Sequence, residues 1–465
     1  MPARATVDRI SGLTLALAIV WTAGDAAAAT VGVAGEGLPF ATHQPSLALV
    51  PHIHVDGETD QLGRIRWLPM TQSVGVPNNM MPADGRTLQV SDHPALAERL
   101  GGAFGGDGDT FQLPDLRGRA PVGIHEPADR GQTSGARNQQ LTEANLPPHR
   151  HETATGSTDP TGEAEPFDIR QPGLGLVVGI QADGAMPSVA TGMADPNSIG
   201  FVSHFAGETL PAGVLPADGR TLSIAAYIPL YSFITTAYGG SGSEFSLPDT
   251  RGRLLVGAGL GPGLEERVLA GTDGAARQTM TSETMPAHSH PDPDMGLPTD
   301  HAGGDQPIPN RQPEIALTPL IAVNGVFPDD SIAVDADSAI VGEVAWFAGN
   351  YVPPGWAIAD GSLLSMAQNT PLFAQLLLAF GGDGQGAFAL PDLRGRTLVG
   401  ASTDSPLGSA FGSDWLGLTA ANLPPHDHAI DRARAPGVIP LPGALPLMLG
   451  ALALLGGLAV RRGMG

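Results

Sequence analysis

The chain has 465 residues, which is enough for about three domains of ordinary size. Its 24 basic residues are all arginine and are outnumbered by 47 acidic residues, so a net charge of −23 would repel polyanions and argues against nucleic-acid binding. The absence of lysine and cysteine removes Schiff-base chemistry, the phosphate-binding P-loop lysine, disulfides and thiol nucleophiles. With 63 glycines and 43 prolines, the sequence favours short strands joined by many turns and ordered loops.

Residues 1–29 have the layout of a secretory signal peptide. Arg4 and Arg9 precede an apolar run from Ile10 to Trp21, and a stretch of small residues ends at Ala29. About a dozen apolar residues are too few to cross a bilayer, which needs about 20. The sequence therefore predicts export rather than an N-terminal membrane anchor.

A repeated unit fills most of the remaining chain. The heptapeptide LPDLRGR or LPDTRGR occurs three times, at 113–119, 247–253 and 390–396. An Asp-Gly turn precedes every copy, a Gln-Pro pair begins every unit, and a His-x-His pair ends it. These signals delimit three modules, at 44–151, 171–290 and 312–428. The polar stretches between them, 152–170 and 291–311, are predicted to be exposed loops or linkers.

Each module is expected to contain one helix and a few short strands. A strand is predicted before the Asp-Gly turn, as at 342–348. Helical spacing follows the turn at 92–104, 225–238 and 366–380, and each helix is expected to stop at a Gly-Gly pair. The predicted fold class is therefore α+β, with three tandem β-rich, irregular modules.

Two recurring acidic motifs are better explained by structure than by chemistry. In LPDxRGR, an Asp that lies two residues before an Arg suits a turn in which the carboxylate accepts backbone and guanidinium hydrogen bonds. The Gly-Gly-Asp-Gly-Asp run at 105–109 could hold calcium, but its counterparts at 239–243 and 381–385 lose one or both acidic residues. Glycines that need a positive φ explain all three copies. Since HExxH, GxSxG and dinucleotide-binding motifs are also missing from the sequence, we expect no enzymatic activity.

The His-x-His pairs carry the strongest chemical signal. In an extended segment, residues i and i+2 point to the same side, so each pair can offer two imidazoles to one ion. Two ligands make only half of a usual zinc site, so pairs from different modules would have to meet. The sequence thus predicts a site for zinc or another transition metal; the alternative is a solvated strand end. The candidate ligands are His149, His151, His288, His290, His426 and His428.

The order of these motifs resembles the phage tail collar domain family. The resembling pattern is a QPxLxL start, a Trp-Phe-Ala-Gly turn, an Asp-Gly turn, GGDGxxxFxLPDLRGR and a PPHxH close, and it is clearest in the third module. Similar modules occur in phage short tail fibres and in microcystin-dependent-protein-like bacterial proteins. In the fibres, the resemblance implies that His-x-His pairs from three chains meet on a metal at a threefold axis. One chain here supplies three pairs, so we expect a pseudo-trimer within one chain.

The C-terminal segment 438–465 combines a proline motif, an apolar run from Val438 to Val460 and two arginines. It resembles the VPLPA-type (PEP-CTERM-like) sorting signals of Gram-negative bacteria. The resemblance implies an exosortase-like processing protease as a partner. About 20 uncharged apolar residues also predict a hydrophobic helix that makes the membrane a partner, either transiently or as a permanent anchor.

Together these features predict a non-enzymatic, exported protein at the cell envelope or cell surface. Its expected role is adhesive, ligand-binding or architectural, with an unidentified surface ligand. The alternative is a structural component of a phage or tailocin tail fibre, which would need neither a signal peptide nor a sorting tail.

Overall fold

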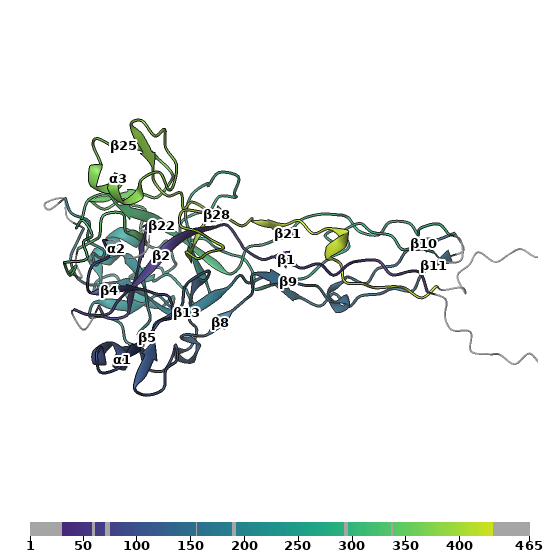
Figure 1. The fold of residues 1–465 in the computed structure, drawn as a ribbon, viewed down its shortest axis with the longest axis horizontal. Coiled ribbons are helices and arrows are strands. Elements are labelled where there is room, and N and C mark those ends of the chain that lie inside the picture. Colours follow the sequence, from purple (N-terminus) through teal and green to yellow (C-terminus); the bar gives the residue numbers. More distant parts are fainter. Residues whose placement is uncertain are drawn as a thin grey trace, which may run out of the picture.

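The chain forms a broad head and a long, narrow stalk (Figure 1). This computed structural model describes residues 30–57, 61–69, 75–154, 156–187, 192–292, 296–335 and 338–430. The predicted signal peptide at 1–29 and the predicted hydrophobic helix at 438–465 lie outside these residues. The head contains the helices and most strands, whereas the short hairpin of β10 (Glu152–Thr153) and β11 (Gly156–Ser157) lies near the far end of the stalk.

The expected α+β class is wrong, because the fold is mostly β, with 34% of residues in strands and 8% in helices. Each predicted helix is present but spans only seven residues. The three helices of the described chain are α1 (Pro94–Leu100), α2 (Ile228–Ile234) and α3 (Thr370–Leu376). Each buries two apolar side chains against the head, so the helices cover the sheet rather than form a layer of their own.

The helices end earlier than the Gly-Gly pairs because the next residue takes a positive φ. That residue is Gly101 after α1 (φ 55°), Thr235 after α2 (φ 50°) and Leu377 after α3 (φ 47°). Glycine adopts this conformation freely, whereas a residue with a Cβ is strained by about 1–3 kcal/mol.

We therefore expect Leu377→Gly to stabilise the protein by about 1 kcal/mol, because it relieves this strain at an exposed position. Urea unfolding of the full chain measures the change. The reverse substitution at the equivalent position, Gly101→Leu, should destabilise the protein. An unchanged midpoint in both variants would contradict the explanation.

Seven strands close into a barrel in the head. Their order is β2–β3–β14–β23–β22–β18–β27 and back to β2. The bounds are β2 Ser46–His54, β3 Arg64–Leu68, β14 Phe201–Phe205, β18 Leu254–Gly257, β22 Glu314–Ala322, β23 Val344–Phe347 and β27 Thr397–Gly400. Two further strands, β7 (Ala120–Gly123) and β13 (Gly173–Gln181), extend the same sheet.

The three repeats exchange strands in a closed cycle. The strand after each LPDxRGR motif pairs in parallel with the first long strand of the next repeat, β7 with β13 and β18 with β22. The third such strand, β27, pairs with β2 of the first repeat, in the same register. Each repeat thus completes its sheet with a strand from another repeat, and the chain closes on itself in an approximate threefold arrangement.

Shorter strands repeat the same pattern around the head. After the Asp-Gly turns come the hairpins β5–β6, β16–β17 and β25–β26. Six other strands pair with the long strands β2, β13 and β22: β4, β15 and β24 near their C-terminal ends, and β28, β8 and β19 near their N-terminal ends. The bounds are β4 Met80–Pro82, β5 Thr87–Gln89, β6 Thr110–Gln112, β8 Thr133–Ser134, β15 Val214–Pro216, β16 Thr221–Ser223, β17 Glu244–Ser246, β19 Thr272–Asp273, β24 Trp356–Ile358, β25 Leu363–Ser365, β26 Ala387–Ala389 and β28 Ala410–Phe411.

The contacts between repeats differ chemically although the backbone pattern is the same. The first and third repeats share a buried ion pair, in which Arg66 Nη1 lies 3.2 Å from Glu343 Oε2. Arg64 of the first repeat donates to the Pro196 carbonyl of the second. The second and third repeats instead pack the rings of Phe201 and Phe347 against each other. Such differences favour one neighbour order, because a charged surface packed on an aromatic one would bury an unpaired charge.

The stalk is built from segments that enter and leave each repeat. Three short antiparallel pairs form its base: β1 (Phe40–Ala41) with β9 (Asn138–Gln139), β12 (Phe167–Asp168) with β20 (Arg277–Gln278), and β21 (Ile308–Pro309) with β29 (Trp415–Leu416). Farther out, single 3₁₀ turns precede two of the His-x-His motifs, at Glu143–Asn145 and Ala420–Asn422. A separate apolar core runs inside the stalk and includes Leu146, Met285 and Leu423, one from each repeat.

In the part of the chain that the structure describes, no helix has the length and apolar character needed to cross a bilayer. Nothing in the described residues bears out the predicted hydrophobic C-terminal helix, the predicted membrane partner or the predicted location at the cell envelope, so all three predictions are withdrawn.

Candidate metal centre

All six predicted histidines meet inside the stalk. Each pair directly follows a Leu-Pro-Pro or Met-Pro-Ala step whose first residue is fully buried in the stalk core. That residue fixes the segment against the other two, and the extended backbone after it directs both imidazoles inward. No more than 7% of the surface of any of the six residues is exposed.

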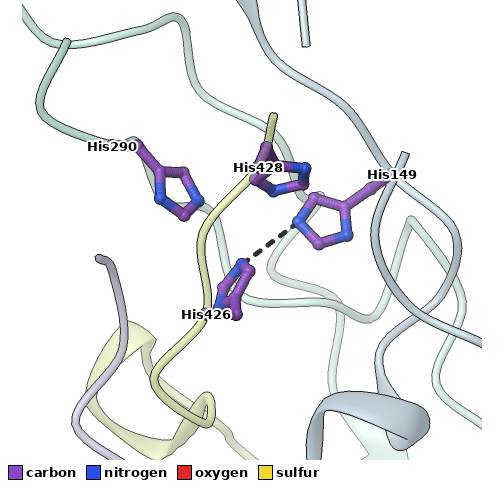
Figure 2. A group of neighbouring side chains, drawn as sticks. All are labelled: His149, His290, His426 and His428. Carbon is purple, nitrogen blue, oxygen red and sulfur yellow. Dashed lines mark hydrogen bonds between the residues drawn. The ribbon is translucent and has the colours of Figure 1, made fainter. Parts of the chain in front are cut away.

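His149, His288 and His426 form a triangle through their Nε2 atoms. The three Nε2–Nε2 distances are 3.2 Å between His149 and His288, 3.1 Å between His288 and His426, and 3.3 Å between His426 and His149. Figure 2 shows the last of these contacts, with the rings of His290 and His428 beside it. The three sides are nearly equal, so the equivalent histidines of the three repeats meet at the approximate threefold axis.

The protonation state of these three rings follows from their other nitrogen. Each Nδ1 lies 2.9–3.0 Å from the carbonyl oxygen of the residue two positions earlier, which is Pro147, Pro286 or Pro424. A carbonyl only accepts, so Nδ1 must carry the proton and donate it. The Nε2 atoms of the neutral rings therefore present lone pairs to one another.

His151, His290 and His428 repeat this arrangement one step along the stalk. Their Nδ1 atoms donate to the carbonyls of Asp300, Gly32 and Asp159, at 2.9, 2.7 and 2.9 Å. Their Nε2 atoms are buried and have no hydrogen-bond partner among the described residues. Six Nε2 lone pairs thus lie in two layers around one axis.

The three accepting carbonyls come from segments that were predicted to be linkers or that precede the first module. Residues 156–165 and 297–306 run back along the stalk. There the backbone of Thr161 pairs with that of His149, and the backbone of Ala302 pairs with that of His288, each as an isolated antiparallel β-bridge. Sequence reasoning missed these residues because a backbone carbonyl leaves no side-chain signal. They orient the second layer of imidazoles as outer ligands orient metal-bound histidines elsewhere.

Burial keeps the six imidazoles neutral at physiological pH. Desolvation lowers the pKa of His149 and His428 to about 4 and that of His288 and His290 to about 3. The same cause lowers the pKa of His151 and His426. Neutral imidazole is the form that binds metal, so the site is prepared for a cation at neutral pH.

The geometry suits a six-coordinate ion. Subsets of four of these histidines place their candidate ligand atoms within 4.8 Å of one another. An octahedron with an edge of about 3.2 Å has metal–nitrogen distances of about 2.3 Å, and a tetrahedron with that edge has about 2.0 Å, close to zinc–imidazole bonds. One triangle fits both shapes, but only an octahedron uses six ligands.

The LPDxRGR motifs are turns, as the sequence predicted. In the first copy, Asp115 Oδ1 accepts hydrogen bonds from the backbone N and from Nε of Arg117, at 3.1 and 2.9 Å, and Arg119 donates to the Asp115 carbonyl. The other two copies make the same bonds. The Gly-rich run at 105–109 has positive φ at three glycines, in keeping with its structural interpretation.

Sequence reasoning overlooked three buried histidines of the head, His52, His54 and His204. Desolvation by burial lowers the pKa of His52 to about 4, that of His204 to about 3 and that of His54 well below 6.5. Each of them stands next to an apolar residue in a strand, which is also the pattern of a histidine on the exposed face of a strand. The sequence therefore gave no signal that these three are buried.

These three histidines predict a loss of stability in mild acid. Their pKa values in the folded state lie below the unfolded value of 6.5, so the unfolded chain binds more protons as the pH falls. Stability is therefore complete above about pH 6.5 and declines as the pH drops towards 4. Thermal melts of metal-free protein at pH 7.5, 6 and 5 test this. His204→Phe should make the decline smaller, and the stalk histidines, whose pKa values are also lowered, account for a further part of it. Equal melting temperatures at all three pH values would contradict it.

Comparison with known proteins found one family. Searches of curated proteins and of solved structures gave no match. The family model described as Phage Tail Collar Domain matches residues 63–121, 200–255 and 342–398. Each match begins just before the central strand β3, β14 or β23 and ends in or beside the strand that follows LPDxRGR. The chain therefore contains three Phage Tail Collar Domain copies, which interlock in one polypeptide.

Proposed function

We propose that this protein is a non-enzymatic, tail-fibre-like structural element whose stalk is held together by one transition-metal ion. The observation that carries the proposal is the convergence of six buried Nε2 atoms on the stalk axis. Three lone pairs at 3.1–3.3 Å repel one another unless a cation lies among them. A metal bound there would join the three repeats near the end of the stalk.

The set of six imidazole ligands favours a six-coordinate first-row ion such as Fe²⁺ or Ni²⁺ over zinc. Imidazole suits Zn²⁺, Cu²⁺, Fe²⁺ and Ni²⁺, but structural zinc sites are almost always tetrahedral. Six protein ligands would also leave no open position for substrate or water, so the centre would be structural rather than catalytic.

Removing the metal tests this role. Bound metal at about 1,000 times its dissociation constant stabilises a protein by about 4 kcal/mol. We expect a strong chelator to lower the melting temperature of the full chain, and readdition of the ion to restore it. If purified protein holds no stoichiometric transition metal, and chelation and reloading leave the melting temperature unchanged, the proposed function is wrong.

A further inference from the structure

We propose that a groove between the first and third repeats binds a short, neutral oligosaccharide. This inter-repeat groove has a volume of about 770 Å³ and is bordered by Asp84, Asp115, Arg117 and Arg119 on one side and by Ser402 and Thr403 on the other. Small-molecule sites in proteins measure about 300–1,000 Å³. The groove belongs to the head, so the inference does not depend on the metal centre.

The first wall offers hydrogen-bond donors and acceptors in fixed positions. Asp84 accepts three bonds from Arg86, and Asp115 accepts three from Arg117. These bonds lock both carboxylates and use only Nε and Nη2 of the Arg117 side chain, which is 53% exposed. The remaining guanidinium N–H groups and carboxylate lone pairs are available to a ligand.

The third repeat and the other lining residues supply hydroxyls and apolar surface. Ser402 and Thr403 bring hydroxyl groups from the loop after β27, while Pro51, Pro82 and Leu407 bring hydrocarbon. A sugar ring presents neighbouring hydroxyls, each a donor and an acceptor, on a ring with C–H faces. Locked carboxylate and guanidinium groups beside hydrocarbon match that surface in both respects.

The groove differs from its two structural counterparts, in which a side chain of the preceding repeat lies over the glycine of the LPDxRGR motif. At Gly252 of the second repeat, a Cβ would collide with the ring of His125 from the preceding repeat. At Gly395 of the third repeat, Leu264 takes the corresponding space, with its Cδ1 3.1 Å from the position of such a Cβ. At Gly118 of the first repeat, the nearest atom is Ser402 Oγ at 3.6 Å.

Side-chain exposure reflects the same difference between the first and third repeats. Arg117 and Arg119 are 53% and 32% exposed, whereas the equivalent Arg394 and Arg396 are 32% and 13% exposed. The hydrogen bonds within the motif are the same in both copies. In the second repeat, Arg251 and Arg253 are 46% and 30% exposed, but His125 lies over the motif glycine there. The motif is therefore scaffold in every repeat, and the first copy combines exposed arginines with open space over its glycine.

Charge decides in favour of a neutral ligand. The groove balances two carboxylates with two guanidinium groups, and the whole chain carries −23. An anionic ligand would approach against the net field, and a cation would compete with the arginines for both carboxylates. A neutral polyhydroxylated molecule meets neither obstacle.

The test uses the full chain on an array of immobilised neutral oligosaccharides, such as maltotriose, cellotriose and chitotriose, together with acidic ones. We expect a neutral oligosaccharide to bind, and Arg117→Ala to weaken its binding about tenfold or more. Ser402→Trp, which fills the groove, should abolish binding. The matched control is Arg394→Ala, which removes the same intramotif bonds from a closed copy and should bind as the parent does.

Thermal melts of all variants check that each is folded. The proposal is overturned if no neutral oligosaccharide binds, if only acidic ones bind, or if Arg394→Ala weakens binding as much as Arg117→Ala. Removal of the metal from the stalk should leave oligosaccharide binding by the head unchanged. The experiments therefore distinguish a failure of the proposed metal centre from a failure of the proposed groove.

Discussion

Replacing His288 with alanine is expected to weaken metal binding by at least about 100-fold and to separate the repeats at the far end of the stalk. Its Nε2 contacts the Nε2 atoms of both His149 and His426, so one substitution opens the triangle. Five imidazoles would remain, and the triangle of Nε2 atoms would lose the two sides that meet at His288. Isothermal titration with Fe²⁺ or Ni²⁺ under anaerobic conditions measures the loss.

The control for this experiment is His301→Ala. His301 is an exposed stalk histidine close to the same centre, but it belongs to neither layer. Its replacement should leave affinity and melting temperature unchanged. Because the head has its own core, near-UV circular dichroism of the tryptophans in the head should persist in both variants. If His288→Ala binds metal as tightly as the parent does, the histidine cluster is not the site.

Glu343→Ala is expected to destabilise the head by about 3–5 kcal/mol, because it removes the carboxylate from the buried ion pair between Glu343 and Arg66. Both side chains are nearly inaccessible, at 0% and 3% exposure, and Glu343 Oε2 also accepts the Ile340 backbone N–H. The loss falls on the contact between the first and third repeats, where the strand cycle closes. Urea unfolding followed by tryptophan fluorescence measures it.

The double variant Arg66→Met with Glu343→Leu separates charge from packing. Replacing both members of a buried pair with apolar groups is often neutral or stabilising, so we expect most of the lost stability to return. Asp404→Ala breaks the exposed Arg137–Asp404 pair and should cost less than about 1 kcal/mol. A Glu343→Ala variant that unfolds at the parental midpoint would show that the pair is unimportant for closure.

The sequence predicted the local elements well. The heptapeptide turns, the Asp-Gly turns and the position of each helix follow from signals a few residues apart, and all of them are present. Helix length was overestimated because apolar spacing continues past Leu377, where a positive φ ends the helix. This error made the fold class α+β, although the body of each repeat is sheet.

The long-range arrangement could not be predicted from such signals. β2 pairs with β27 about 350 residues later, and the sequence of neither strand indicates which strand it pairs with. The same holds for the Gly32 and Asp300 carbonyls that orient the second histidine layer. The histidines themselves could be predicted, because i and i+2 spacing is local and the pair recurs three times. The open groove could not, because it depends on which side chain from another repeat covers each copy of one motif.

The most direct test of the account is native mass spectrometry of the purified full chain. A monomeric chain carrying one transition-metal ion, which is lost together with thermal stability on chelation, is the predicted result. Three chains sharing one ion, or a monomer that carries none after reloading, would contradict a metal centre built within a single polypeptide.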